Sequence, residues 1–79
     1  MSPLFVELQA ILHGLNLIVE RKWTDVSIES DSKLAVDICN SVIEWNGHQQ
    51  ALVFYIRHLL TTTGTKLCYI SRDANLCAD

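Results

Sequence analysis

Residues 26–32 read Val-Ser-Ile-Glu-Ser-Asp-Ser, an apolar-polar alternation that runs into a group of small polar residues. Val26 and Ile28 alternate with polar side chains, which predicts a strand because successive side chains of a strand point to opposite faces. Residues 30–32 are favoured at the N-cap of a helix. The stretch therefore predicts a strand that passes directly into a helix, with Asp31 at the carboxyl end of the strand.

The segment before this strand has the spacing of an amphipathic helix. Its apolar residues recur at intervals of three and four, which predicts a helix over about 3–21: they are Leu4, Leu8, Ile11, Leu15 and Ile18. Glu7 lies on the same side as Ile11, so it is a carboxylate on or beside the buried face. Gly14 costs roughly 1 kcal/mol in the middle of a helix, and we expect it to let the helix approach a strand closely.

Three elements are predicted after residue 32. A helix over about 33–43 has Leu34, Ile38 and Val42 on its inner face, and a polar loop follows. A helix over about 50–62 ends at Gly64, and its predicted inner residues are Leu52, Val53, Ile56, Leu59 and Leu60. Residues 66–71 alternate as a strand, and the last residues begin another helix.

The order strand, helix, helix, strand requires a crossover between parallel strands. The sequence therefore predicts an α/β fold in which residues 1–79 form one partial domain. A two-stranded sheet is not stable alone, so we expect the strand at 26–28 to have an unpaired edge where other strands belong. We also expect the inner face of the first helix to be more exposed than in a complete domain.

Composition limits the class of protein. The chain has 79 residues, of which 49% are hydrophobic, and its formal net charge is −3. Its longest apolar run is far too short to span a membrane, and its N-terminal stretch lacks the basic region of a secretory signal. The three cysteines are odd in number and have no Cys-x-x-Cys spacing, which indicates reduced thiols. We therefore expect an intracellular protein, nuclear or cytoplasmic, whose oligomeric state the sequence leaves open.

Three carboxylates are predicted to approach one end of the sheet. Asp31 ends the first strand, Asp79 follows the second strand, and Glu7 reaches the same rim if the first helix packs across the sheet. Carboxylates that converge repel one another, and oxygen ligands of this kind hold Mg²⁺. Metal held in this way activates water and stabilises a leaving oxygen, as in phosphodiester cleavage. Taken singly, Asp31 also fits a helix cap and Glu7 a partly exposed helix residue.

The chain resembles the ribonuclease H-like domains of plant proteins and retroelements. The matching stretches are residues 7–11, 14–15, 26–32, 56–57, 69–75 and 78–79, which include Glu-Ser-Asp-Ser at the strand end and Arg-x-x-Asn-x-x-Ala-Asp at the close. The resemblance implies hydrolysis of the RNA strand of RNA–DNA hybrids with two Mg²⁺ ions. It implies that Glu7, Asp31 and Asp79 are metal ligands and catalytic residues, and that Ser32, Arg72 and Asn75 bind substrate.

The chain also departs from this family. The family opens with three antiparallel strands, the first of which carries a leading catalytic Asp, and we expect that ligand to be lacking here. Tyr69 stands where many members have His. Two functions follow from the sequence: a metal-dependent endonuclease domain, and a non-catalytic fragment that binds nucleic acid or another partner. An upstream strand bearing Asp-Gly would favour the enzyme.

Overall fold

The computed structural model describes residues 3–71, which form three helices and two strands. Their bounds are α1 Pro3–Arg21, β1 Ser27–Ser30, α2 Lys33–Cys39, α3 Gln50–Thr63 and β2 Lys66–Tyr69. Over residues 3–71 the predicted order of elements is confirmed, and so is the mixed α/β class with parallel strands and flanking helices. The helix predicted to begin after the second strand lies outside the described residues. Among the described residues, no helix is both long and apolar enough to cross a membrane.

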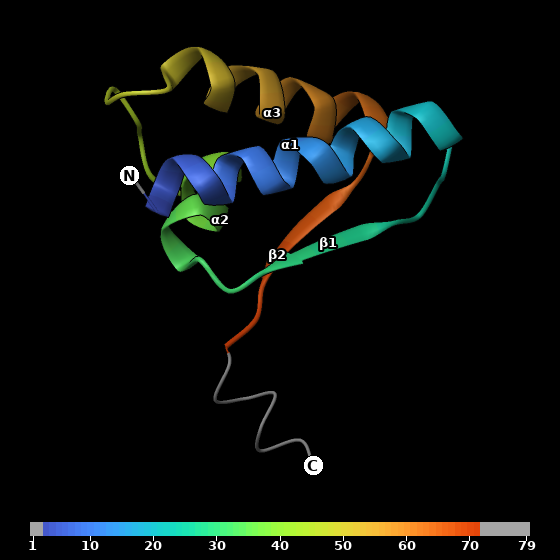
Figure 1. Ribbon diagram of the computed structural model, residues 1–79, viewed down its shortest axis with the longest axis horizontal. Coiled ribbons are helices and arrows are strands. Elements are labelled where there is room, and N and C mark those ends of the chain that lie inside the picture. Colours follow the sequence, from blue (N-terminus) through green and yellow to red (C-terminus); the bar gives the residue numbers. More distant parts are fainter. Residues whose placement is uncertain (1–2, 72–79) are drawn as a thin grey trace.

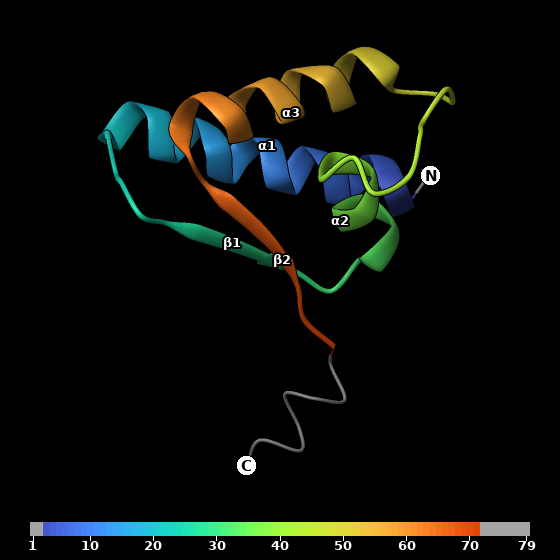
Figure 2. The same ribbon diagram turned by 180° about the vertical axis from the view of Figure 1, so that it is seen from behind.

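The helices lie on one side of the two strands. Figure 1 shows α1 and α3 side by side, with β1 and β2 beneath them and α2 beside the amino end of α1. The reverse view gives the same arrangement (Figure 2). The link from β1 into α2 therefore lies at the same end of the molecule as the first turns of α1. This arrangement places the first turns of α1 near the carboxyl end of β1.

The two strands pair in parallel, as predicted. The register pairs Ser27 with Lys66, Ile28 with Leu67, Glu29 with Cys68 and Ser30 with Tyr69. The carbonyls of Val26 and Ser30 accept hydrogen bonds from the backbone N–H groups of Lys66 and Ile70. Because backbone groups alternate in direction along a strand, those of Ser27 and Glu29 face the outer edge of β1. No described residue pairs with that edge.

The outer edge of β2 carries one side-chain hydrogen bond among the described residues. The side-chain amide of Asn40 donates a hydrogen bond of 2.9 Å to the main-chain carbonyl of Leu67. Asn40 is the residue that follows α2, so this bond ties the end of α2 to the edge of β2. Within residues 3–71, no strand pairs with the outer edge of β1, which is the edge where the sequence predicts a further strand.

The apolar core lies where the three helices meet the inner face of the sheet. Its buried members come from every helix and from β2: Leu8, Ile11, Leu15, Ile18, Ala35, Val36, Ile38, Cys39, Val53, Ile56, Leu59 and Leu67. Burial of one such large side chain contributes about 1.5–3 kcal/mol. The expectation of an exposed inner face on α1 is wrong, because α3 packs along that face and Leu8 and Leu15 are 0% exposed.

Helix α2 is shorter than predicted. It ends at Cys39 instead of near residue 43, because Ser41 takes a left-handed backbone conformation with φ 63°. The N–H groups of Ser41 and Val42 then turn back and donate to the carbonyls of Ile38 and Asp37, which is a common helix ending. Val42 lies beyond the helix and is 68% exposed, so its predicted place on an inner face is wrong.

The buried face of α2 also differs from the prediction. Leu34 is 48% exposed, while the buried residues are Ala35, Val36, Ile38 and Cys39. A helix of seven residues makes only two turns, and this one is covered by α3 on one side and by β2 on another. Because contacts come from two directions, residues that are adjacent in the sequence are both buried. A prediction based on one helix face with a spacing of three or four residues does not include such adjacent pairs.

Gly14 lies at a close contact between α1 and β1. A Cβ atom at Gly14 would lie 3.3 Å from Cδ1 of Ile28. That distance is tighter than ordinary van der Waals contact, so the absence of a side chain lets the helix rest on the strand. The predicted reason for a glycine in the middle of this helix is confirmed.

Candidate metal centre

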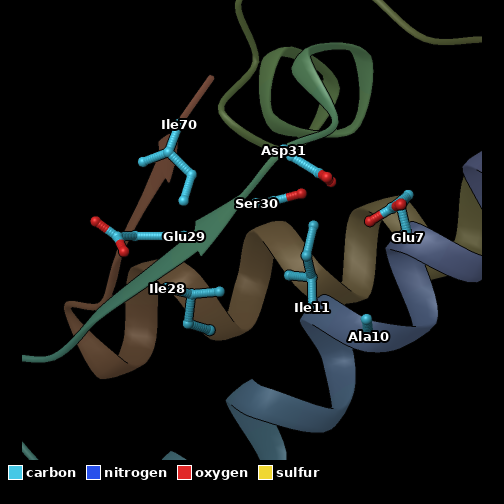
Figure 3. Close-up of a pocket in the computed structure, with 8 residues that line it drawn as sticks. All are labelled: Glu7, Ala10, Ile11, Ile28, Glu29, Ser30, Asp31 and Ile70. Carbon is cyan, nitrogen blue, oxygen red and sulfur yellow. The ribbon is translucent and has the colours of Figure 1, made fainter. Parts of the chain in front are cut away.

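A cavity of about 360 Å³ opens between the first half of α1 and the carboxyl end of β1. Its lining is Glu7, Ala10, Ile11, Ile28, Glu29, Ser30, Asp31 and Ile70. Figure 3 shows the carboxylates of Glu7 and Asp31 and the hydroxyl of Ser30 directed into the same space. Ile11 and Ile28 form an apolar wall below them. The cavity thus combines two acidic groups with one hydroxyl beside the open edge of β1.

Glu7 reaches the cavity because of its position on α1. It lies on the side of the helix that carries Ile11 and Gly14, and this side faces β1. Glu7 is half-buried, whereas its neighbours Val6 and Gln9 are exposed. A carboxylate in this position loses part of its hydration, which favours a cation or a hydrogen-bond donor beside it.

Asp31 occupies the bend between β1 and α2, and its neighbours hold that bend. The N–H of Ser32 donates to Oγ of Ser30 at 3.1 Å, and Oγ of Ser32 accepts from the N–H of Ala35 at 3.3 Å. Ser32 is therefore the N-cap of α2, and the alternative in which Asp31 caps the helix is wrong. The two serines fix the backbone on both sides of Asp31, so its direction is set by β1 and by α2 together.

Two other acidic residues near β1 do not join this pair. Glu29 borders the cavity, but Figure 3 shows its carboxylate on the opposite side of the strand from Asp31. Asp25 lies at the amino end of β1, where it borders a separate cavity of about 140 Å³ with Lys66 and Gly64. Glu7 and Asp31 are therefore distinguished from nearby carboxylates by where their side chains point.

Three predicted site residues lie outside the described residues: Arg72, Asn75 and Asp79. Within residues 3–71, no three His, Cys, Asp or Glu side chains gather closely enough to hold a metal ion. Glu7 and Asp31 meet at one cavity, and their role as metal ligands stays a prediction. Ser32 uses its hydroxyl as an acceptor in the helix cap, and its contact with substrate also stays a prediction.

The donors that line the cavity fit a hard cation. Two carboxylates and a hydroxyl are oxygen ligands, and Mg²⁺ prefers oxygen and completes its shell with water and substrate phosphate. Among the described residues, the cavity lining has no sulfur or imidazole, the donors that favour zinc or copper. The residues present therefore suit Mg²⁺ or Mn²⁺ in kind.

Sequence reasoning missed the hydroxyl of Ser30 in the cavity, and it missed a contact of Arg57 outside the cavity. Ser30 contributes a hydroxyl to the cavity, and the signal was available because Ser30 shares the face of β1 with Ile28. Arg57 lies on α3 and donates to the carbonyl of Ile38 near the end of α2. Nothing in the local sequence pattern of α3 indicates this contact, since it joins residues that are distant along the chain.

Comparison with known protein families gives a match. A model of the reverse transcriptase-like family, whose members have ribonuclease H-like domains, matches residues 1–79. No curated protein and no solved structure matches the chain. The match extends over all the elements that form the cavity, and membership of such a family indicates nucleic-acid binding. The chain therefore belongs to the reverse transcriptase-like family of ribonuclease H-like domains.

Proposed function

We propose that this chain is the metal-binding part of an endonuclease domain that hydrolyses the RNA strand of RNA–DNA hybrids. The observation that carries the proposal is the meeting of Glu7 and Asp31 at one cavity in a chain of ribonuclease H-like family. The motifs at residues 26–32 and 69–79 support a place among the domains of plant proteins and retroelements. An intracellular location, nuclear or cytoplasmic, is consistent with such a substrate.

The chain's residues divide the work between holding metal and shaping the site. Glu7 and Asp31 would be the ligands, joined by Asp79 from the last motif. Bound Mg²⁺ would activate a water molecule and neutralise charge on the phosphate. Ile11 and Ile28 exclude bulk water from one side of the carboxylates, which strengthens their attraction for a cation. In a protein of net charge −3, the cation also offsets the repulsion between the site and a polyanion.

The open edge of β1 supports a further element of the proposal. The backbone groups of Ser27 and Glu29 are available along that edge, directly beside the cavity. A strand added there would place its own side chains next to Asp31, and a carboxylate on it would complete the ligand set. We therefore propose that the active form includes such a strand, and that the chain without it binds Mg²⁺ weakly.

The test measures metal binding and cleavage in parallel. Mn²⁺ binding is followed by calorimetry for the chain itself, and cleavage of a labelled RNA–DNA hybrid with Mg²⁺ is followed for the chain fused behind a three-stranded segment that carries an Asp. Asp31→Asn and Glu7→Gln remove ligand charge but keep side-chain shape. Both should abolish cleavage by the fused protein and weaken Mn²⁺ binding by the chain.

Asp25→Asn is the matched control, because Asp25 lies at the other end of the same strand. Asn also tolerates the left-handed conformation of Asp25, with φ 57°. This variant should cleave normally. Full cleavage by the fused Asp31→Asn form would contradict the ligand assignment. Hybrid binding without cleavage in every form would instead support the non-catalytic nucleic-acid-binding fragment.

A further inference from the structure

Arg57 joins the middle of α3 to the end of α2 through main-chain hydrogen bonds. Its Nε and Nη2 donate to the carbonyl oxygen of Ile38 at 3.0 and 2.7 Å, and Nη2 also lies 3.5 Å from the carbonyl oxygen of Ile43. The side chain is half-buried and its guanidinium lies 5.8 Å from the centroid of the Phe54 ring. Two nitrogens of one planar group therefore bind a single helix carbonyl.

The carbonyls at the end of a helix lack partners within the helix and carry its partial negative charge. A guanidinium is suited to this position, because it is always charged and holds its donors in a fixed fork. Cys39, the last residue of α2, is buried beside the same cation. Arg57 thus supplies a buried end of α2 with both charge and hydrogen bonds.

Helix α2 depends on such contacts for its place. A helix of seven residues is not stable alone in water, so its position comes from tertiary contacts. Within residues 3–71, two side chains tether its far end: Arg57 to α3, and Asn40 to β2. At its near end Ser32 provides the cap, directly after Asp31. A shift of this short helix would move the bend that carries Asp31.

We propose that Arg57 is a positioning residue for Asp31, acting through α2. By binding the carbonyl of Ile38, Arg57 fixes the orientation of α2, and the Ser32 cap transmits that orientation to the bend before it. The inference rests on the proposed function where it treats Asp31 as a metal ligand. The connection from Arg57 through α2 to the bend at Asp31 rests only on the hydrogen bonds described above. Arg57 itself is not among the residues that line the cavity.

The experiment uses the isotope-labelled 79-residue chain and two nuclear magnetic resonance measurements. Amide exchange of Ala35 reports the Ser32 cap, with the amide of Leu15 in α1 as an internal reference. Titration with Mn²⁺ reports metal affinity through broadening of the Asp31 and Ser32 signals. The variants are Arg57→Gln, which removes the charge, and Arg57→Lys, which keeps the charge but not the fork.

Arg21→Gln is the matched control. The Arg21 guanidinium also lies beside a ring, 6.0 Å from the centroid of Trp23, but it is at the far end of α1. Loss of a residue that hydrogen-bonds a metal ligand typically weakens metal affinity by about 10- to 100-fold. Arg57 acts on Asp31 only through α2, so we expect a smaller effect, about a five-fold weaker Mn²⁺ affinity in Arg57→Gln. In the same variant the amide of Ala35 should exchange faster, while that of Leu15 should exchange at its original rate. Arg57→Lys should give intermediate values of Mn²⁺ affinity and Ala35 exchange. Arg21→Gln should leave both quantities unchanged.

Several outcomes would overturn the inference. One is a folded Arg57→Gln chain with unchanged Ala35 exchange and Mn²⁺ affinity. Another is equal acceleration at Ala35 and Leu15, which indicates loss of general stability. If Arg57→Gln does not fold, Arg57→Lys is judged by the same criteria. Failure of Mn²⁺ to broaden Asp31 in the unaltered chain contradicts the proposed function instead, while Ala35 exchange still decides the link from Arg57 to the bend.

Discussion

The side-chain amide of Asn40 binds the main-chain carbonyl of Leu67 at 2.9 Å, and this bond joins α2 to the edge of β2 that faces away from β1. An asparagine at this position satisfies a backbone acceptor that would otherwise be open to a neighbouring strand. The bond also gives α2 a fixed distance from the sheet. Its energetic weight can be measured separately from that of the apolar core.

Asn40→Asp replaces the donor with a carboxylate of the same shape. We expect the free energy of unfolding to fall by about 1–3 kcal/mol, because a partly buried carbonyl loses its partner and faces a negative charge. Urea denaturation at neutral pH measures the change. Asn46→Asp is the control, since the Asn46 side chain is exposed and acts as an acceptor for Gln50 at 3.4 Å. An equal decrease in unfolding free energy in both variants would show that the Asn40 hydrogen bond does not contribute specifically to stability.

Gly14 and Ile28 should be energetically coupled. A methyl group in Gly14→Ala would meet Cδ1 of Ile28 at 3.3 Å, which offsets the gain in helix propensity of about 1 kcal/mol. Ile28→Val removes that δ-carbon, so Gly14→Ala should be more stabilising in the Ile28→Val background than in the unaltered chain. A double-mutant cycle of unfolding free energies gives the coupling, which we expect to be about 0.5 kcal/mol or more. Simple additivity of the two changes would contradict the close contact.

Cys39 should make stability depend on pH in alkaline solution. Burial raises the pKa of its thiol from 9.0 to about 11, although the charge of Arg57 offsets part of the rise. Between these pH values the thiol of the unfolded chain loses its proton, while that of the folded chain keeps it. The contribution of Cys39 to the free energy of unfolding is therefore full below pH 9 and decreases as the pH rises toward 11. At about 1.4 kcal/mol per unit of pKa, the loss is roughly 2–3 kcal/mol.

Urea denaturation at several pH values, for the unaltered chain and for Cys39→Ala, isolates this contribution. The difference in unfolding free energy between the two should shrink from about pH 8 to about pH 10.5, because the alanine variant has no thiol to ionise. A constant difference would contradict a raised pKa for Cys39. Alkylation at pH 8 should modify the exposed Cys68 well before the buried Cys39.

The two edges of the sheet should differ in amide exchange. The N–H groups of Ser27 and Glu29 face the open edge of β1, whereas that of Ile28 faces β2. We therefore expect fast exchange at Ser27 and Glu29 and slow exchange at Ile28 in the 79-residue chain. Fusion behind a three-stranded segment should slow Ser27 and Glu29. Slow exchange of both amides without any added strand would show that the edge is already paired.

The sequence was sufficient for the elements whose stability is local or strongly periodic. The apolar spacing along residues 3–21 identified α1 with its bounds, and Gly64 correctly ended α3, where it adopts a left-handed φ of 69°. The alternation at 26–29 located β1. In each case the buried or partly buried side chains recur at the regular spacing of one face of the element, so the pattern is visible in the sequence.

The end of α2 could not be predicted in this way. Val42 continues the apolar spacing beyond the helix, but the chain turns at Ser41, and Arg57 of α3 binds the Ile38 carbonyl inside the turn. These contacts join distant residues, so no short window of sequence contains them. The meeting of Glu7 with Asp31 was predicted, but only on the condition that the first helix packs across the sheet, and no short window of sequence shows that packing.

The parallel pairing of β1 with β2 has a consequence for how the chain folds. Two helices separate the strands along the chain, so strand pairing closes a long loop. Closing the loop costs conformational entropy, which the contacts formed on pairing must offset. On the ribosome, β1 emerges while its partner is still unsynthesised, so both of its edges are exposed to chaperones and to neighbouring nascent chains.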